Sequence, residues 1–520
     1  MGMKWRVIRE KIVKLMCKPV FWFFVVICFC NLVFTKQMMH DFSVLKVLLI
    51  LLAEIVATGA VMAGVYFMRK KGYSIEKQFL LIVIAIGALF ITVMPPGQAP
   101  DEGGHFMRAY GVADGKLVAD VLDENSRSVG SNIPNETTFI LAYGGAAGER
   151  NTYEWAWEEL FRSPSGETHP EGYNTLAVYN FVCYIPQALG ILVGKILGLS
   201  VLAMGYLAKI FNFAMFVFLI YWAIKLIPKY KSALMFVALL PITMQEATSI
   251  APDAMAIALG IFTISYALYL SSDKVIKITR KQIAIMMVSG VVLSLCKIVY
   301  LPMVLLYLIV PREKFGSKKQ KWLITGGVVA LAAIFNLAWL ATSFGFITET
   351  NKGVNASEQV AGVLKNPINY MMVVMRTITT YAIDWTLGMV GTGIGMTGAG
   401  LPGIYYLITM PIFVLIVAQR NEKLELSVFQ KSVFGAVLVM VFGLILTSLY
   451  TQWTPLNKII IEGVQGRYFL PILLIVPILC ARTKNIRNAK YPEIVREPTI
   501  IYYSVLTNLL VVTSVFISNL

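Results

Sequence analysis

The chain alternates long apolar runs with short polar stretches rich in lysine and arginine. Crossing the hydrocarbon core of a bilayer takes about 20 consecutive apolar residues, so runs of this kind predict transmembrane helices. We therefore expect an all-α polytopic membrane protein with about 13 transmembrane helices and a large outer loop. The expected spans cover residues 19–36, 44–68, 79–95, 201–224, 232–250, 253–271, 283–297, 299–311, 322–343, 401–418, 433–450, 467–481 and 499–518.

The composition agrees with this pattern. Hydrophobic residues make up 57% of the 520-residue chain and charged residues only 14%, whereas soluble domains carry roughly 25% charged residues. A water-soluble globule of this size could not bury so much apolar surface, and a disordered chain would be far more polar. Composition thus excludes both classes.

The net charge of +16 follows the membrane topology and does not indicate a nucleic-acid partner. Residues 95–173 hold thirteen acidic and five basic side chains, and the basic residues elsewhere lie in short stretches between apolar runs. Cytoplasmic loops of membrane proteins carry such an excess of lysine and arginine. We expect a cytoplasmic N terminus, with residues 95–173 on the outer side of the membrane.

Two apolar segments are predicted not to cross the membrane. Residues 175–197 are interrupted by Pro186 and several glycines, and a crossing there would put the following lysine cluster outside. We interpret them as a re-entrant or interfacial segment, and residues 369–391 as an interfacial helix of a second outer region. The predicted divisions are an N-terminal pair at 1–78, a core at 79–343, the second outer region at 344–400 and C-terminal helices at 401–520.

The most informative polar motif follows the third expected span. Asp101 and Glu102 come directly after a Pro/Gly-rich turn, and His105 and Arg108 follow at helical spacing. A carboxylate at the membrane face can accept a proton from a substrate hydroxyl, and an arginine can hold a phosphate by paired hydrogen bonds. The alternative is a helix N terminus whose acidic first turn stabilises the helix dipole.

A second motif, Gly463–Pro471, lies where a span is expected to re-enter from the outer face. Arg467 can meet a lipid phosphate there, assisted by Tyr468, Gln465 and the backbone N–H groups of the glycine-bounded turn. The alternative is an Arg/Tyr anchor that only fixes the depth of the helix. Since arginine is disfavoured on the outer side, we favour the phosphate-binding interpretation.

Further ionisable residues lie near the expected outer ends of helices. Glu246 and Asp253 can bind substrate or acceptor, or can form a structural contact between helices. Lys297 can pair with either carboxylate or bind phosphate. His169 lies at the edge of the outer loop, where it either contacts the acceptor or is an ordinary exposed histidine.

Several chemistries lack the motifs they need. The sequence contains no P-loop, no G-x-S-x-G and no H-E-x-x-H, so ATP hydrolysis, serine hydrolysis and zinc proteolysis are not indicated. The six cysteines form no C-x-x-C pair, and there are only three histidines. If a divalent cation takes part, Asp101, Glu102 and His105 would bind Mg²⁺ or Mn²⁺.

Taken together, these segments resemble an uncharacterised family of bacterial multi-span membrane proteins. Its members are similar to the GT-C glycosyltransferases, which use polyprenyl-phosphate-linked sugars. The matching pieces run in order along the chain: Pro100–Glu102 with His105 and Arg108–Tyr110, Tyr184–Gly190, Pro252–Ala254, Lys297 with Tyr300–Pro302, and Gly463–Pro471.

The resemblance implies a sugar transfer from a polyprenyl phosphate to an acceptor hydroxyl of a cell-surface glycan or glycolipid. It assigns the role of general base to Asp101, with Glu102 as the alternative. Arg108, Lys297 and Arg467 would stabilise the departing phosphate. In one respect the chain departs from the GT-C pattern: two expected spans precede the span that leads into the acidic motif, so the N-terminal pair is expected to be an addition.

Two other functions stay open at this stage. A transporter or flippase of a lipid-linked glycan would distribute its charges through the centres of the spans, but most charged candidates here cluster at outer helix ends. A non-catalytic component of an envelope-polymer assembly complex would use the outer loop for docking. In that case Asp101 would be replaceable.

Overall fold

The computed structural model describes residues 21, 25, 43–123, 128–137, 152–343, 353–395, 401, 403–417, 426–480 and 497–519. Within these ranges the chain is predominantly helical. Most of the expected span 19–36 lies outside the described residues.

Seven of the described helices are long and apolar enough to cross a membrane. All seven coincide with spans expected from the sequence, and they support a polytopic, predominantly helical membrane protein. They are α3 (Val44–Lys70), α4 (Ile75–Val93), α10 (Val201–Leu226), α13 (Asp253–Ser271), α15 (Lys318–Ser343), α19 (Val428–Gln452) and α22 (Glu497–Ser518).

The expected total of thirteen crossings is not supported, because five expected spans are occupied by shorter elements. These regions contain α11 (Lys231–Ala238) and α12 (Pro241–Ala247); α14 (Arg280–Cys296); the 3₁₀ helix η2 (Ile298–Ile309); α18 (Gly403–Val417); and η5 (Gly466–Phe469), α20 (Leu470–Leu473) and α21 (Ile475–Cys480). The other helices are α5 (Glu102–Ala113), α7 (Thr152–Leu160), α8 (Asn174–Ala177), η1 (Phe181–Tyr184), α9 (Ile185–Ile196), η3 (Arg312–Phe315), α16 (Ala356–Lys365) and α17 (Pro367–Val390).

The break between α11 and α12 has an identifiable cause. Pro241 takes a position in the first turn of α12, where its missing N–H needs no partner. Side chains satisfy the carbonyls that the break releases: Thr243 donates to Val237 O at 3.0 Å, and Asn508 donates to Leu239 O at 2.6 Å. A helix can be interrupted inside a membrane protein when the freed backbone groups are paired in this way.

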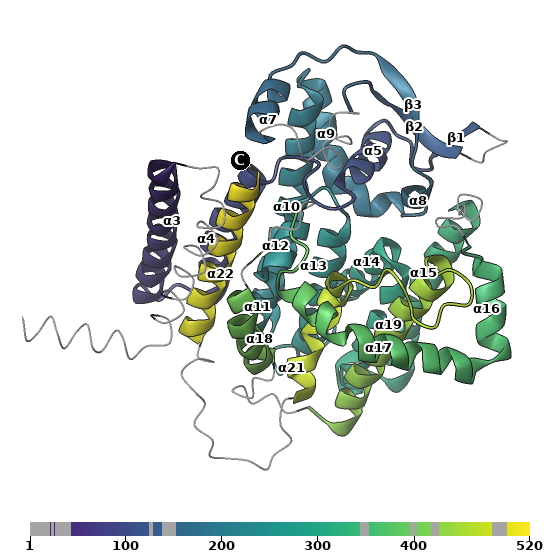
Figure 1. Cartoon of the computed structure of the whole chain (residues 1–520). Helices are drawn as coiled ribbons and strands as arrows, with labels where there is room; N and C mark the ends of the chain where they lie inside the picture. The colour runs from purple at the N-terminus through teal and green to yellow at the C-terminus, as the bar shows by residue number, and fades with distance from the viewer. Residues whose placement is uncertain are drawn as a thin grey trace, which may run out of the picture.

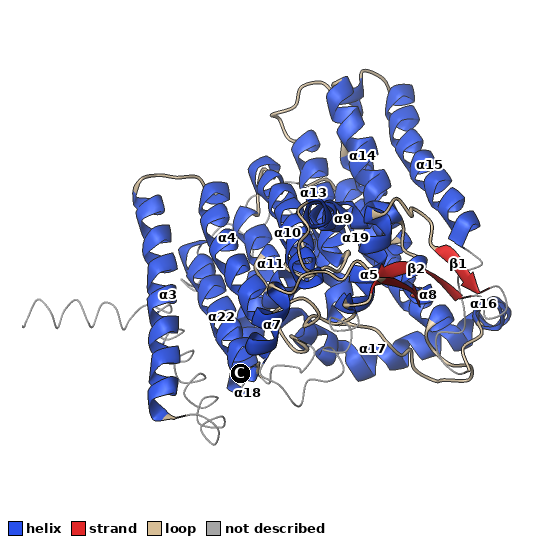
Figure 2. Ribbon diagram, turned by 90° about the horizontal axis from the view of Figure 1, so that it is seen from above, coloured by secondary structure: helices blue, strands red, loops and turns tan. Residues whose placement is uncertain are grey.

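The helices are arranged around a central group. Figures 1 and 2 show α3, α4 and α22 side by side at one edge, with α10 and α13 farther inside. α13 and α22 are almost entirely enclosed by the rest of the protein, whereas most of α3 is exposed. In Figure 2, α17 runs across the long axes of α3, α4 and α22.

The polar segment 95–173 carries its own secondary structure, which includes the only strands in the described part of the chain. β1 (Asp120–Asp123), β2 (Ser128–Pro134) and β3 (Thr168–Gly172) form an antiparallel sheet in the order β1-β2-β3, with Ile133 opposite His169. The prediction of an all-α polytopic membrane protein is supported, and this small sheet adds strands to the segment expected to be a large outer loop. Figure 2 shows the sheet beside α5 and α8.

Residues 175–197 form α8, η1 and α9 rather than one long helix. α9 packs closely along α10, and at Gly190 an added Cβ would lie 2.4 Å from the Leu207 carbonyl oxygen. Glycine therefore permits the contact between these two helices. Lys209 of α10 reaches the turn that leads into the acidic motif, and α9 packs against α5, the helix that follows that motif.

Candidate functional site

Asp101 lies at the N-cap of α5, where the turn that follows α4 ends. Its φ of 61° is in the left-handed region, which aspartate tolerates better than most residues. This conformation leaves its side chain 66% exposed, while Arg467 Nη2 lies 3.5 Å from Asp101 Oδ2. The carboxylate is therefore accessible to a solute and has a cation beside it.

Glu102, the next residue, faces the opposite way and is buried. Its Oε2 accepts hydrogen bonds from the backbone N–H groups of Gly97 at 2.8 Å and Ala99 at 3.1 Å. Its Oε1 accepts from the N–H of Ile250 at 3.0 Å and lies 3.1 Å from Lys209 Nζ. Since protein donors occupy both oxygens, the Glu102 carboxylate has a structural role.

Arg467 comes from η5 and lies between two carboxylates. Its Nη1 is 3.1 Å from Glu246 Oε1 on α12, on the side opposite to its contact with Asp101. Close packing of η5 against α17 fixes this position: at Gly466 an added Cβ would lie only 2.2 Å from the Trp385 carbonyl oxygen. The glycine thus brings the arginine to the carboxylates.

A second ion pair lies nearby. Lys297, between α14 and η2, pairs with Asp253 at the start of α13. The ring of Tyr468 links this pair to Arg467, because Lys297 Nζ is 4.8 Å and the guanidinium carbon of Arg467 is 5.7 Å from the ring centroid. Two cations thus lie over one half-buried aromatic ring, an arrangement stabilised by the negative face of the ring.

His105 is the buried histidine of the cluster. Its Nδ1 lies 2.8 Å from the hydroxyl of Tyr184, and its ring packs edge-on against Tyr179. Burial lowers the pKa of the His105 imidazole to about 4, so the ring is neutral near pH 7. It can therefore offer a hydrogen bond without adding charge.

The structure brings together seven of the residues singled out from the sequence. Six elements or turns supply them, and they form a compact group of two ion-paired cations, three carboxylates, one tyrosine and one neutral imidazole. Asp253, Asp101, Lys297 and Arg467 all lie within electrostatic range of His105. The seven, hereafter the charged cluster, are Asp101, His105, Glu246, Asp253, Lys297, Arg467 and Tyr468.

Three other candidates are held elsewhere. Arg108 is fully buried, and its guanidinium donates to the carbonyls of Lys116 at 3.0 Å and Leu117 at 2.7 Å. His169 lies on β3, with its Nδ1 3.0 Å from Asn135 Oδ1. Gln465 caps η5 with its carbonyl and has an exposed side chain. Arg108 stabilises the loop after α5 and is not available to a phosphate.

Sequence reasoning missed two tyrosines and one lysine that support the charged cluster. Tyr179 and Tyr184 enclose His105, and Lys209 neutralises Glu102 from inside α10. The lysine did leave a signal, because a charge well inside a membrane span normally has a partner or a function. The tyrosines left none, since aromatic residues are common at membrane interfaces.

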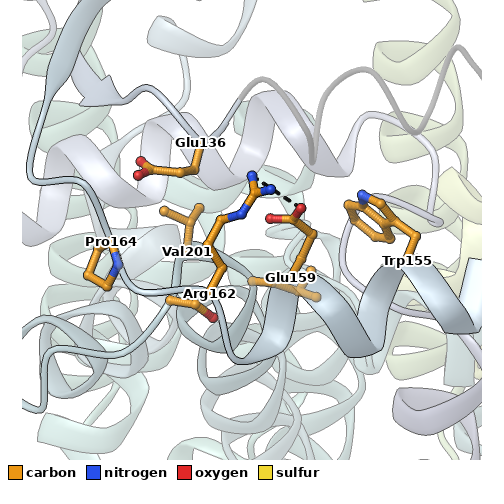
Figure 3. Close-up of a pocket in the computed structure, with 8 residues that line it drawn as sticks. Glu136, Trp155, Glu159, Arg162, Pro164 and Val201 are labelled. Carbon is orange, nitrogen blue, oxygen red and sulfur yellow. Dashed lines mark ion pairs between the residues drawn. The ribbon is translucent and has the colours of Figure 1, made fainter.

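A separate hollow lies on the polar segment 95–173, against the start of α10. Figure 3 shows Glu136, Trp155, Glu159, Arg162 and Val201 around it. Its charges are engaged within the protein, because Arg162 pairs with Glu159 at 3.2 Å and Glu136 accepts from the N–H of Ser165 at 2.6 Å. None of the charged cluster lines this hollow.

The described residues contain no group of three or more His, Cys, Asp or Glu side chains placed to hold a metal ion. Asp101, Glu102 and His105 do not converge, because Glu102 turns inward to N–H donors and Lys209, and His105 Nδ1 is engaged by Tyr184. The positive charges in the charged cluster are the side chains of Arg467 and Lys297.

The sequence matches the family model described as "Predicted membrane protein (DUF2142)" over residues 82–476. The chain belongs to this family. DUF2142 is a domain of unknown function, and the match includes all seven residues of the charged cluster but not α3 or α22. No curated protein and no solved structure matches the chain.

Proposed function

We propose that this DUF2142 protein is a glycosyltransferase that moves a sugar from a polyprenyl-phosphate donor to a hydroxyl of a cell-surface glycan or glycolipid. The observation that carries the proposal is the pairing of an exposed Asp101 carboxylate with Arg467, beside which lies a second mostly enclosed cation, Lys297. A transferase needs a proton acceptor beside a site for a negatively charged leaving group, and the charged cluster offers both.

The reaction would proceed as a single displacement. The acceptor hydroxyl gives its proton to Asp101 while its oxygen attacks the anomeric carbon of the donor sugar. The bond between that carbon and the phosphate oxygen breaks, and its electron pair goes to the phosphate. Arg467 and Lys297 would stabilise this charge, because cations fixed in a partly dry site act strongly on charge that develops during reaction.

The surroundings favour Asp101 over Glu102 as the base. Glu102 already accepts three backbone N–H groups and pairs with Lys209, so taking up a proton would break that network. Among the described residues, the Asp101 carboxylate has one polar contact, at 3.5 Å with Arg467. His105, held neutral by burial, would donate a hydrogen bond to a hydroxyl of the acceptor.

The proposal includes an orientation. The seven spans support a multi-pass membrane protein, and the charge pattern favours a cytoplasmic N terminus with the charged cluster facing outward in a bacterial cytoplasmic membrane. The donor would reach the cluster from the lipid phase. The segment 1–78 would then be an addition to a GT-C-like core, in keeping with a family match that begins at residue 82.

A turnover assay tests the proposal. Purified protein in lipid nanodiscs is incubated with a panel of radiolabelled polyprenyl-phosphate sugars, and Asp101→Asn and Arg467→Ala are compared with wild type. Asp120→Asn and Arg312→Ala are matched controls, because both residues are exposed and lie outside the cluster. We expect sugar release that requires Asp101 and donor binding that requires Arg467.

The result that overturns the proposal is equally definite. If no donor in the panel turns over, and the Asp101→Asn variant still supports the surface glycan of the cell, the catalytic role fails. Transport of a lipid-linked glycan then becomes the leading function, and it is assayed as movement of a labelled lipid across the membrane of proteoliposomes. A role in an assembly complex is the next alternative.

A further inference from the structure

The turn that presents Asp101 is held from inside the membrane by α10. Lys209 is fully buried on α10, and its Nζ lies 3.1 Å from Glu102 Oε1 and 2.7 Å from the carbonyl oxygen of Met94. These two contacts hold the beginning and the end of the turn that connects α4 to α5. One lysine thus fixes the whole turn.

The same helix also holds the turn before Asp253. Asn212, one helical turn along α10 from Lys209, donates from Nδ2 to the carbonyls of Ser249 at 2.8 Å and Ala251 at 3.0 Å. Residues three apart on a helix lie on one face, so a single face of α10 reaches both turns.

The two turns are also joined directly. The backbone N–H of Ile250 donates to Glu102 Oε1 at 3.0 Å, the oxygen that also meets Lys209. On the other side of this turn, Gln187 of α9 donates to the carbonyl of Ile250 at 3.1 Å. The turn before Asp253 is therefore held through both its carbonyl and its N–H groups.

We propose that Lys209 and Asn212 are positioning residues that hold the Asp101 turn and the Asp253 turn in a fixed relation. Glu102 joins the two turns, because its Oε1 accepts from both Lys209 and the N–H of Ile250. The claim about geometry stands on these contacts alone. The claim that the geometry matters for turnover rests on the proposed function, because Asp101 is then the base and Asp253 orients the phosphate-binding Lys297.

A buried lysine in a span has another common use, as part of an ion or proton path. The contacts disfavour it here. Lys209 and Glu102 are both fully enclosed, and their charged groups are satisfied by one another and by backbone atoms of the two turns. A path would need one of these groups to face a water-filled space.

Hydrogen–deuterium exchange of the full chain in nanodiscs tests the geometric claim. In Lys209→Met we expect backbone amides of 95–104 and of 248–254 to exchange faster together, by about tenfold, because opening of both turns becomes easier. Amides of β2 and α15 should keep their wild-type rates. Lys225→Met is the matched control, since Lys225 lies on the same helix with its ammonium over the Trp222 ring.

The outcomes separate the two claims. Faster exchange in both turns supports the positioning role, whereas a change confined to 95–104, or no change in either, overturns it. If Lys209→Met fails to fold, Asn212→Leu is measured in its place, with faster exchange expected first in 248–254 and then in 95–104. Lys209→Arg, which keeps the charge, should restore slow exchange.

Turnover is the second readout. If the proposed function holds, Lys209→Met should lower kcat by at least about tenfold because the base is misplaced. The rise in KM should be smaller, because Arg467 comes from neither turn and still binds the donor phosphate although Lys297 is less well oriented. An equal effect on both parameters contradicts a positioning role. If no donor turns over in wild type, the exchange experiment still decides whether α10 couples the turns.

Discussion

The guanidinium of Arg467 lies 3.1 Å from the carboxylate of Glu246, although the two residues are 221 positions apart in the chain. Both side chains are nearly enclosed, so the pair is a buried ion pair between η5 and α12. Such a pair adds little stability compared with apolar residues of the same size, but breaking one side of it leaves an uncompensated charge.

Replacing Arg467 by alanine should therefore lower the stability of the whole protein as well as donor binding. Removing one partner of a buried ion pair typically costs about 3–5 kcal/mol. We expect Arg467→Ala to lower the midpoint of thermal unfolding in nanodiscs and Arg467→Ala/Glu246→Leu to recover most of the loss. If the double variant is no more stable than the single one, the pair is not buried as described.

Asp101 should be dispensable for stability and required for activity. Its carboxylate is mostly exposed, and its φ of 61° favours glycine. We expect Asp101→Gly to unfold at the same temperature as wild type or slightly higher, and Asp101→Ala to be less stable by about 1 kcal/mol. Both variants should lose at least about a hundredfold in sugar transfer, measured with the labelled donor. Transfer retained in Asp101→Gly would exclude Asp101 as the base.

The contact of η5 with α17 predicts the effect of adding a single methyl group. At Gly466 the new Cβ would lie 2.2 Å from the Trp385 carbonyl oxygen, so Gly466→Ala must displace η5 and Arg467. We expect weaker donor binding in an equilibrium assay. Gly435→Ala on α19 is the control, because nothing lies within 4 Å of its added Cβ. Helix propensity should make that control neutral or more stable by up to about 1 kcal/mol.

The buried His105 predicts a pH dependence of stability. Its pKa is about 4 in the folded protein and about 6.5 in an unfolded chain. Between these values the unfolded chain binds a proton at this residue that the folded chain excludes, so the free energy of unfolding falls as the pH drops from 6.5 towards 4.

Thermal unfolding of wild type and His105→Gln between pH 4 and pH 7 measures this contribution. We expect the wild type to lose more stability on acidification than the variant, because glutamine cannot take up the proton. Identical pH profiles would mean that His105 is not buried in a neutral form. The remaining histidines are present in both proteins and cancel in the comparison.

The membrane class, the seven long spans and most members of the cluster could be predicted from sequence. Hydropathy over about 20 residues is a strong signal, and ionisable residues at helix ends stand out against an apolar background. The pairing of Lys297 with Asp253 was one of three alternatives that the sequence left open, beside pairing with Glu246 and binding phosphate. Family membership also follows from ordered segments along the chain.

The remaining features depend on tertiary structure. Asp101 and Glu102 are adjacent carboxylates with identical sequence signals, and only the left-handed turn at Asp101 decides which one faces outward. Arg108 was expected to bind phosphate, but its guanidinium points to the carbonyls of Lys116 and Leu117 in the loop after α5. The count of thirteen spans is not supported, in part because a short apolar run around a proline, such as the run around Pro241, can form an interrupted helix when side chains satisfy its free backbone groups.

The ion pair between Lys209 and Glu102 also bears on how the chain enters the membrane. A lysine well inside a span disfavours insertion of that helix by about 3 kcal/mol when it is unpaired. Glu102 precedes Lys209 in the chain, so the ribosome makes the acid and two of its N–H donors, Gly97 and Ala99, before α10 leaves the exit tunnel. The order of synthesis therefore supplies the counter-charge ahead of the helix that needs it, and exchanging the two charges between Glu102 and Lys209 would remove that advantage.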